Sequence, residues 1–194
     1  EPAEDQALRG SIPALTAVEN EISRKVRQQY EENPYPRWVK CPVSVIPATV
    51  DGYLGGRFPY ASFDALGKAN SDVEILVAGC GTGQHAIETA LLFRGARVLA
   101  IDLSGISLAY AMRKTGEHGV RDIEYAQADI LGMGSLGRAF DVVESVGVLH
   151  HLADPLQGLR VLLSLLRPGG FMRLGLYSER ARAVVNVVPR FVNF

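Results

Sequence analysis

The chain has 194 residues, of which 47% are hydrophobic, so it is long enough for one globular domain with an additional segment. Its formal net charge is −1 at pH 7, which gives no electrostatic reason to expect nucleic acid or an anionic membrane as a partner. The apolar runs are too short to span a membrane. Its two cysteines, Cys41 and Cys80, are expected to be reduced thiols, as in a cytoplasmic protein.

Residues 1–70 are predicted to form a helix and an irregular segment that leans on the main domain as a cap. The first ten residues are polar and are expected to be frayed. Apolar residues then recur at helical spacing from Leu15 to Tyr30, and Thr16 with Glu19 fits a capping box. The proline after Asn33 ends this helix. Glycines and prolines recur from residue 41 to residue 66, so this stretch is expected to be irregular.

Strands and helices alternate in residues 71–194, the predicted main domain. The predicted strands cover residues 73–78, 97–101, 123–126, 140–146 and 171–177, and the predicted helices cover residues 84–93, 104–117 and 154–166. This alternation predicts an α/β fold of Rossmann type, with a parallel sheet between two layers of helices. In such a fold the ligand lies at the carboxyl ends of the strands, near the point where the strand order reverses.

A glycine loop after the first predicted strand is the strongest functional signal. Gly79, Gly81 and Gly83 alternate with Cys80 and Thr82 in this loop. Glycine tolerates positive φ and lets the backbone come close to a ligand, and the helix that follows directs free N–H groups toward the same place.

An acid stands at the end of the next predicted strand. Asp102 lies 19 residues after Gly83 (102 − 83), which is about the distance at which an acid reaches the ribose hydroxyls in a nucleotide-binding βαβ unit. The loop and this acid together predict a nucleotide-type site. The alternative for Asp102 is a cap of the following helix.

Several short segments resemble, in their order, the class I S-adenosylmethionine-dependent methyltransferases. The similarity extends from about Val73 to Ser178, and its segments are residues 79–83 (GCGTG), Asp102, 128–130 (ADI), 140–143 (FDVV), 149–152 (LHHL) and 166–170 (LRPGG). Residues 30–38 (YEENPYPRW) are similar to a segment that precedes this domain in some bacterial methyltransferases, several of them attached to tetratricopeptide repeats. The resemblance implies a bacterial-type transferase that uses S-adenosyl-L-methionine as methyl donor.

The resemblance also implies roles for individual residues. The glycine backbone would pass close to the methionine part and the ribose of the cofactor, and Asp102 would accept hydrogen bonds from both ribose hydroxyls. Asp129 would accept one from the adenine amino group, although it is otherwise a simple loop acid. The backbone at the end of the fourth strand would hold the cofactor ammonium. The predicted cofactor residues are Gly79, Cys80, Gly81, Gly83, Gln84, Asp102, Leu103, Asp129, Ile130, Glu144 and Ser145.

Two histidines follow the fourth predicted strand, at the rim where an acceptor would sit. His150 and His151 are candidates for the base that deprotonates an oxygen or nitrogen nucleophile, and the alternative is that they pack the loop before Asp154. The histidines show no metal-ligand spacing, so no metal is expected. Tyr30, Tyr35, Arg37 and Trp38 are expected either to line the substrate wall or to pack on the sheet.

The chain departs from the family pattern in two places. Val77 stands where many members carry an acid that helps to hold the methionine end of the cofactor. The family sheet usually has seven strands, and the residues after Tyr177 are too few for a helix and two strands, although residues 184–188 fit a short strand or a helix end. We therefore expect an incomplete sheet, either because the chain is a piece of a longer protein or because another subunit covers the edge by self-association.

Two other functions stay open at this point. A Rossmann-type NAD(P)-binding oxidoreductase would need its third glycine one residue later, where Gln84 stands. The other alternative is a cofactor-binding but inactive or truncated methyltransferase-like subunit. No motif indicates the methyl acceptor, which would be a small molecule or a protein.

Overall fold

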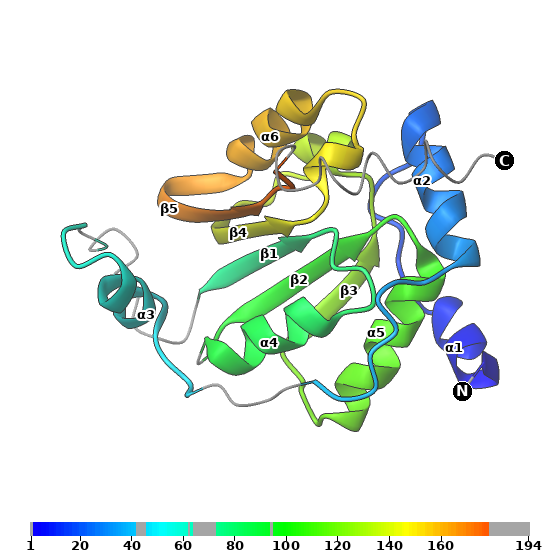
Figure 1. The fold of residues 1–194 in the computed structure, drawn as a ribbon, viewed down its shortest axis with the longest axis horizontal. Coiled ribbons are helices and arrows are strands. Elements are labelled where there is room, and N and C mark those ends of the chain that lie inside the picture. Colours follow the sequence, from blue (N-terminus) through cyan, green and yellow to red (C-terminus); the bar gives the residue numbers. More distant parts are fainter. Residues whose placement is uncertain (1, 42–45, 62, 64–72, 94, 179–194) are drawn as a thin grey trace, which may run out of the picture.

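Figure 1 shows a computed structural model of the chain, which describes residues 2–41, 46–61, 63, 73–93 and 95–178. Five parallel strands form one sheet: β1 (Glu74–Ala78), β2 (Arg97–Asp102), β3 (Ile123–Gln127), β4 (Phe140–Val146) and β5 (Leu166–Gly175). Their order is β3-β2-β1-β4-β5, so the strand order reverses between β1 and β4. The predicted Rossmann-type sheet is confirmed.

The sheet is covered on both faces, and β1 shows why its sequence is apolar throughout. Ile75 and Val77 pack with α4 (Gln84–Leu92) and α5 (Gly105–Glu117), whereas Leu76 and Ala78 pack with α6 (Pro155–Ser164) and the 3₁₀ turn η2 (Ile130–Ser135). All four β1 side chains are at most 1% exposed. A parallel strand buried on both faces needs a continuous apolar run, because successive side chains point to opposite faces.

The first two helices of the chain both differ from the sequence prediction. The first ten residues are not frayed throughout: Pro2–Arg9 forms α1, which lies beside α5 and pairs Asp5 with Arg113 at 2.7 Å. The next helix, α2, covers Glu21–Glu32 and starts later than predicted. Asn20 is its N-cap, with Oδ1 accepting hydrogen bonds from the Ile22 and Ser23 amides.

The capping box predicted at Thr16 is therefore wrong. Thr16 Oγ1 accepts a hydrogen bond from the Asp129 amide at 2.7 Å, which ties the N-terminal segment to the sheet. The predicted end of the helix is confirmed, with Asn33 as the C-cap. The stretch expected to be irregular contains a further helix, α3 (Val50–Arg57), which Thr49 caps.

The two edges of the sheet differ. At the β3 edge, Ala14 pairs with Gln127, and hydrogen bonds of 2.8 and 2.9 Å join Pro13 and Leu15 to that residue, so the N-terminal segment pairs with the last residue of β3. At the other edge, β5 pairs with β4 and with no other strand among the described residues. The stretch 184–188 lies outside the described residues.

Strand β5 starts earlier than predicted and ends earlier. Leu166 already pairs with Phe140, whereas Phe171 pairs with Val142, so the residues between Leu166 and Phe171 bulge out of the ladder. Residues 167–170, which separate the predicted helix 154–166 from the predicted strand 171–177, therefore form an irregularity inside β5, with Gly169 at φ 77°. The strand ends at Gly175 and not at Tyr177.

Candidate active site

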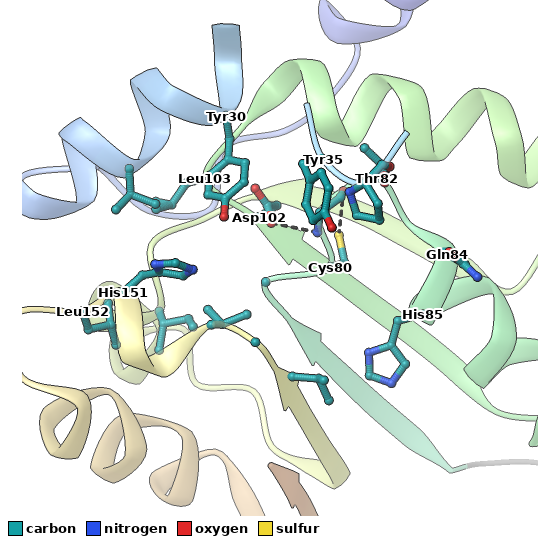
Figure 2. Close-up of a pocket in the computed structure, with 18 of the residues that line it drawn as sticks. Tyr30, Tyr35, Cys80, Thr82, Gln84, His85, Asp102, Leu103, His151 and Leu152 are labelled. Atoms are coloured by element: carbon teal, nitrogen blue, oxygen red, sulfur yellow. Dashed lines mark hydrogen bonds between the residues drawn. The ribbon is translucent and has the colours of Figure 1, made fainter. Parts of the chain in front are cut away.

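A cavity of about 420 Å³ lies at the carboxyl ends of the strands, where the strand order reverses. Figure 2 shows how the loops after β1, β2 and β4 form its floor and how the N-terminal segment lies over it. The lining residues include nine of the predicted site residues: Gly79, Cys80, Gly81, Gln84, Asp102, Leu103, Asp129, Ile130 and His151. This is where a ligand is expected in an open parallel sheet.

The loop glycines differ in what an added side chain would contact. All have positive φ, namely 79° at Gly79, 53° at Gly81 and 86° at Gly83. A Cβ on Gly81 would lie 3.2 Å from the Tyr35 carbonyl oxygen, at the cavity wall. A Cβ on Gly83 would instead lie 2.5 Å from the Ala111 Cβ on α5. Gly83 does not line the cavity, so packing against α5 accounts for this glycine.

Asp102 holds the glycine loop through its carboxylate. Oδ2 accepts a hydrogen bond from the Gly81 amide at 2.8 Å, and Oδ1 accepts one from the Ser104 amide at 2.9 Å. Burial raises the pKa of Asp102, and the two backbone donors oppose this shift. A carboxylate has about four acceptor positions, so this group keeps acceptor capacity toward the cavity.

Cys80, between the first two glycines, is a buried free thiol. Burial raises its pKa well above the ordinary value, and the Asp102 carboxylate adds to this shift. A thiol of this kind is unreactive, so Cys80 fills the turn beside the cavity rather than acting as a nucleophile.

Asp129 and Ile130 line the cavity next to β3. The Asp129 side chain is buried, and its Oδ1 accepts a hydrogen bond from the Leu131 amide at 3.0 Å, which caps η2. Leu103 lies nearby, and its carbonyl accepts from Gln127 Nε2 at 2.7 Å. The acid that the sequence places in this loop thus has a structural role and also faces the cavity.

The N-terminal segment forms the roof of the cavity with Tyr30, Tyr35 and Pro36. Tyr30 and Tyr35 lie over the glycine loop and Asp102 (Figure 2). Hydrogen bonds fix this roof to the core. Ser104 Oγ donates to the Tyr30 carbonyl, and the Gly105 amide donates to Glu31 at 2.7 Å.

Trp38 anchors the far end of this roof outside the cavity. Its indole Nε1 donates to the Thr82 carbonyl at 3.1 Å, and its ring packs against Tyr110 and His118. Neither Trp38 nor Arg37 lines the cavity. Of the four residues expected at the substrate wall or in packing, Tyr30 and Tyr35 are therefore at the wall, and Trp38 packs.

Only one of the two neighbouring histidines lines the cavity, and the other packs against aromatic rings. His151 lines the cavity, whereas His150 does not. The two rings lie 4.2 Å apart, His150 packs on Tyr177 at 4.3 Å, and Tyr30 meets His151 edge-on at 6.3 Å. Burial raises the pKa of the Tyr30 hydroxyl, to which the Asp102 charge also contributes. The cavity is therefore lined on one side by the rings of Tyr30, Tyr35, His151 and Tyr177, which together are called the aromatic mouth.

A polar cluster at the start of α4 was not recognised as a unit from the sequence. Glu144 is buried, accepts from Thr89 Oγ1 at 2.6 Å, and lies 3.1 Å from His85 Nε2 and 3.3 Å from Arg173 Nη1. Burial alone would raise the pKa of Glu144, but the hydrogen bonds from His85 and Thr89 and the charge of Arg173 lower it. The signal available in the sequence was a charge in the middle of a buried strand, which requires a partner.

This cluster reaches the cavity through His85 and Arg173, while Glu144 and Ser145 lie behind the surface. No group of three or more potential ligands in the described part of the chain is arranged to hold a metal ion. Within the same ranges, no helix combines the length and the apolar character that a membrane crossing requires.

Comparison with known proteins agrees with this geometry. Residues 75–170 match the family described as a methyltransferase domain. An uncharacterised protein of Synechococcus sp. is 34% identical over 91% of this chain and 42% of its own length. A ubiquinone biosynthesis O-methyltransferase of Parvibaculum lavamentivorans is 31% identical over 58% of this chain and 43% of its own length. The chain thus spans less than half of each relative.

A solved structure described as "Conversion of a Disulfide Bond into a Thioacetal Group during Echinomycin Biosynthesis" has the same fold. It aligns with a TM-score of 0.58 and 24% identity, over 85% of this chain and 63% of that one. Residues 75–170 are thus similar to a methyltransferase domain, and the similarities support a class I S-adenosylmethionine-dependent methyltransferase with S-adenosylmethionine as cofactor.

Proposed function

We propose that the protein to which this chain belongs transfers the methyl group of S-adenosylmethionine to an oxygen or nitrogen atom of an acceptor bound at the aromatic mouth. The observation that carries this proposal is the cavity at the strand-order reversal, which brings the glycine loop, Asp102 and Asp129 onto one surface. These residues are separated along the chain and meet only through the parallel sheet.

The cofactor is proposed to lie along the floor of this cavity. Asp129 accepts from the adenine amino group while Ile130 packs on the ring, and Asp102 accepts from the two ribose hydroxyls. The backbone at Gly79 and Gly81 lies under the ribose and the methionine part, because these glycines leave no side chain there. Gly83 and Ser145 support the loop and β4 from behind.

Methyl transfer itself is a direct displacement. The acceptor atom attacks the methyl carbon, the carbon–sulfur bond breaks, and its electron pair stays on sulfur as a neutral thioether. The protein holds the reactants in line and excludes water. We assign the base to His151, because it lines the cavity, and a positioning role to His150, because its ring lies against His151 and Tyr177. The name of the Parvibaculum relative supports an oxygen acceptor.

Titration calorimetry tests the cofactor assignment. We expect S-adenosylmethionine and S-adenosylhomocysteine to bind the chain and nicotinamide dinucleotides not to bind. Transfer of a labelled methyl group to cell-extract fractions then tests the activity. Binding of a nicotinamide alone would overturn the assignment, and cofactor binding without transfer by the full-length protein would indicate an inactive subunit.

We also propose a cytoplasmic location, a small-molecule or protein acceptor rather than a nucleic acid, and self-association at the β5 edge. Support comes from the two free thiols, from the net charge of −1, and from the exposure of Leu174, Leu176 and Tyr177 along β5 and just after it. Sedimentation velocity is expected to show a concentration-dependent dimer that Leu176→Lys weakens. A strictly monomeric chain at high concentration would contradict the self-association.

A further inference from the structure

The polar cluster at the start of α4 lies at a particular level of the sheet. In the strand register, Val77 of β1 is opposite Glu144 of β4, and Glu144 is opposite Arg173 of β5. Residues opposite one another in neighbouring parallel strands project on the same face. Val77 is apolar and fully buried, so the negative charge at this level comes from the adjacent strand, about 5 Å away.

The cluster combines both signs of charge beside the glycine loop. His85 projects from the first turn of α4, on the side of the loop away from Leu103 and His151 (Figure 2). The N-cap Gly83 offers no side-chain cap, and no acid stands in the first turn of α4. The amides of that turn and the helix dipole therefore add positive potential beside Arg173.

A purely structural ion pair does not account for this arrangement. The Glu144 side chain is 3% exposed, but the Arg173 side chain is 53% exposed and lines the cavity together with His85. A guanidinium has five N–H donors, and the two contacts at Nη1 leave the others directed elsewhere. Arg173 is thus held by a buried carboxylate while it presents donors to the cavity.

We propose that Arg173, Glu144 and His85 form the subsite for the α-carboxylate at the amino-acid end of the cofactor. Arg173 and the first amides of α4 bind the α-carboxylate, and Glu144, which lies behind the cavity surface, holds Arg173 in position. His85 and Thr89 hold the Glu144 carboxylate in place. This inference rests on the proposed function, because it takes S-adenosylmethionine as the ligand.

Calorimetry on the full chain with two nucleosides tests the subsite. S-adenosylhomocysteine carries the amino-acid end, and 5′-methylthioadenosine lacks it. We expect Arg173→Leu to weaken binding of S-adenosylhomocysteine by about ten- to a hundredfold, as for loss of charged hydrogen bonds, and to leave 5′-methylthioadenosine unchanged. Arg173→Lys retains the charge and is expected to lose less. Arg97→Ala, which removes an exposed arginine at the opposite end of the sheet, is the matched control.

A second ligand isolates the carboxylate. Decarboxylated S-adenosylhomocysteine lacks the group that Arg173 is proposed to bind, so Arg173→Leu is expected to leave its affinity unchanged, whereas Glu144→Gln, which removes the charge that holds Arg173, is expected to weaken binding of S-adenosylhomocysteine. If Glu144→Gln does not fold, the variants of the half-exposed Arg173 still test the subsite. Equal affinity of the Arg173→Leu and unaltered chains for S-adenosylhomocysteine would overturn the subsite and leave the proposed function standing. Failure of both nucleosides to bind the unaltered chain would instead remove the proposed function.

Discussion

Replacing Asp102 by alanine tests the adenosine site most directly. In the structure this carboxylate accepts from the Gly81 and Ser104 amides, and we propose that it also accepts from both ribose hydroxyls. Hydrogen bonds to a charged acceptor are worth about 1.5–3 kcal/mol each, so loss of the pair is expected to cost roughly 3–6 kcal/mol of binding free energy. This corresponds to a weakening of Kd by about two to four orders of magnitude.

The assay is calorimetric titration with S-adenosylhomocysteine and 5′-methylthioadenosine. Both ligands carry the ribose, so Asp102→Ala is expected to weaken them by the same factor, in contrast to Arg173→Leu. Because alanine also leaves the Gly81 and Ser104 amides without their acceptor, thermal unfolding is measured in parallel. Asp122→Asn, at the exposed opposite end of the sheet, is the control. An unchanged Kd in a folded Asp102→Ala variant would refute the ribose role.

The pH dependence of binding gives an independent check. Burial raises the pKa of Asp102 above its ordinary value of 3.8, so this group takes up a proton earlier on acidification than an exposed aspartate does. A protonated carboxyl is a poorer acceptor, and affinity for 5′-methylthioadenosine is therefore expected to fall as the pH falls through the raised pKa. Asp102→Asn removes the titrating group and is expected to abolish this fall in affinity at low pH.

Four further outcomes are expected. Gly83→Ala is expected to lower the free energy of unfolding by roughly 2–4 kcal/mol in denaturant titrations, because residue 83 has φ 86° and a Cβ there would meet α5. The control Gly55→Ala lies in open space within α3 and is expected to raise the free energy of unfolding by about 0.5–1 kcal/mol. Trp38→Phe is expected to lower the melting temperature and the cofactor affinity together, because the Thr82 carbonyl loses its buried donor; a change in neither would show that the roof is held elsewhere. The pKa of Glu144 is lower in the folded protein than its ordinary value of 4.5, so its contribution to stability is present above pH 4.5 and is lost as the pH falls through the folded-state pKa. Urea titrations at several pH values are expected to show this loss of stability in the unaltered chain and not in Glu144→Gln. His151→Ala is expected to lower kcat by about 10²–10⁴-fold with little change in cofactor Kd. An unaltered kcat would show that His150 and His151 only pack the loop and that neither acts as the base.

Local patterns were sufficient to predict the sheet and the loops that line the cavity at its carboxyl end. The apolar run of β1, the glycines after it and the acid that ends β2 can each be recognised in a short window, since a strand buried on both faces is predominantly apolar. The predicted helix 104–117 agrees with α5, which Ser104 caps and which Gly119 follows with φ 66°. The ends of β5 were predicted less well, because the bulge after Leu166 depends on the partner strand.

The N-terminal segment shows where local patterns were insufficient. Thr16 and Glu19 have the spacing of a capping box, but Thr16 is used by Asp129, which lies 113 residues away, and Asn20 caps the helix instead. Likewise α1 is polar and short, which predicts fraying, yet it lies against α5 with Asp5 paired to Arg113. Contacts with distant residues decided both cases, because a helix of eight residues has little stability of its own.

The amino-acid sequence by itself determined the class of the fold, the strand that ends in the glycine loop, and the acid at the end of the next strand. These features depend on side-chain periodicity and on the conformational freedom of glycine, which act within a few residues. Only the tertiary structure decided that Glu144, Arg173 and His85 form one cluster, that His151 rather than His150 faces the cavity, and that Tyr30 and Tyr35 form the roof. The physical reason is that strand register and helix docking bring together residues far apart in the chain, and no local pattern specifies which of them meet.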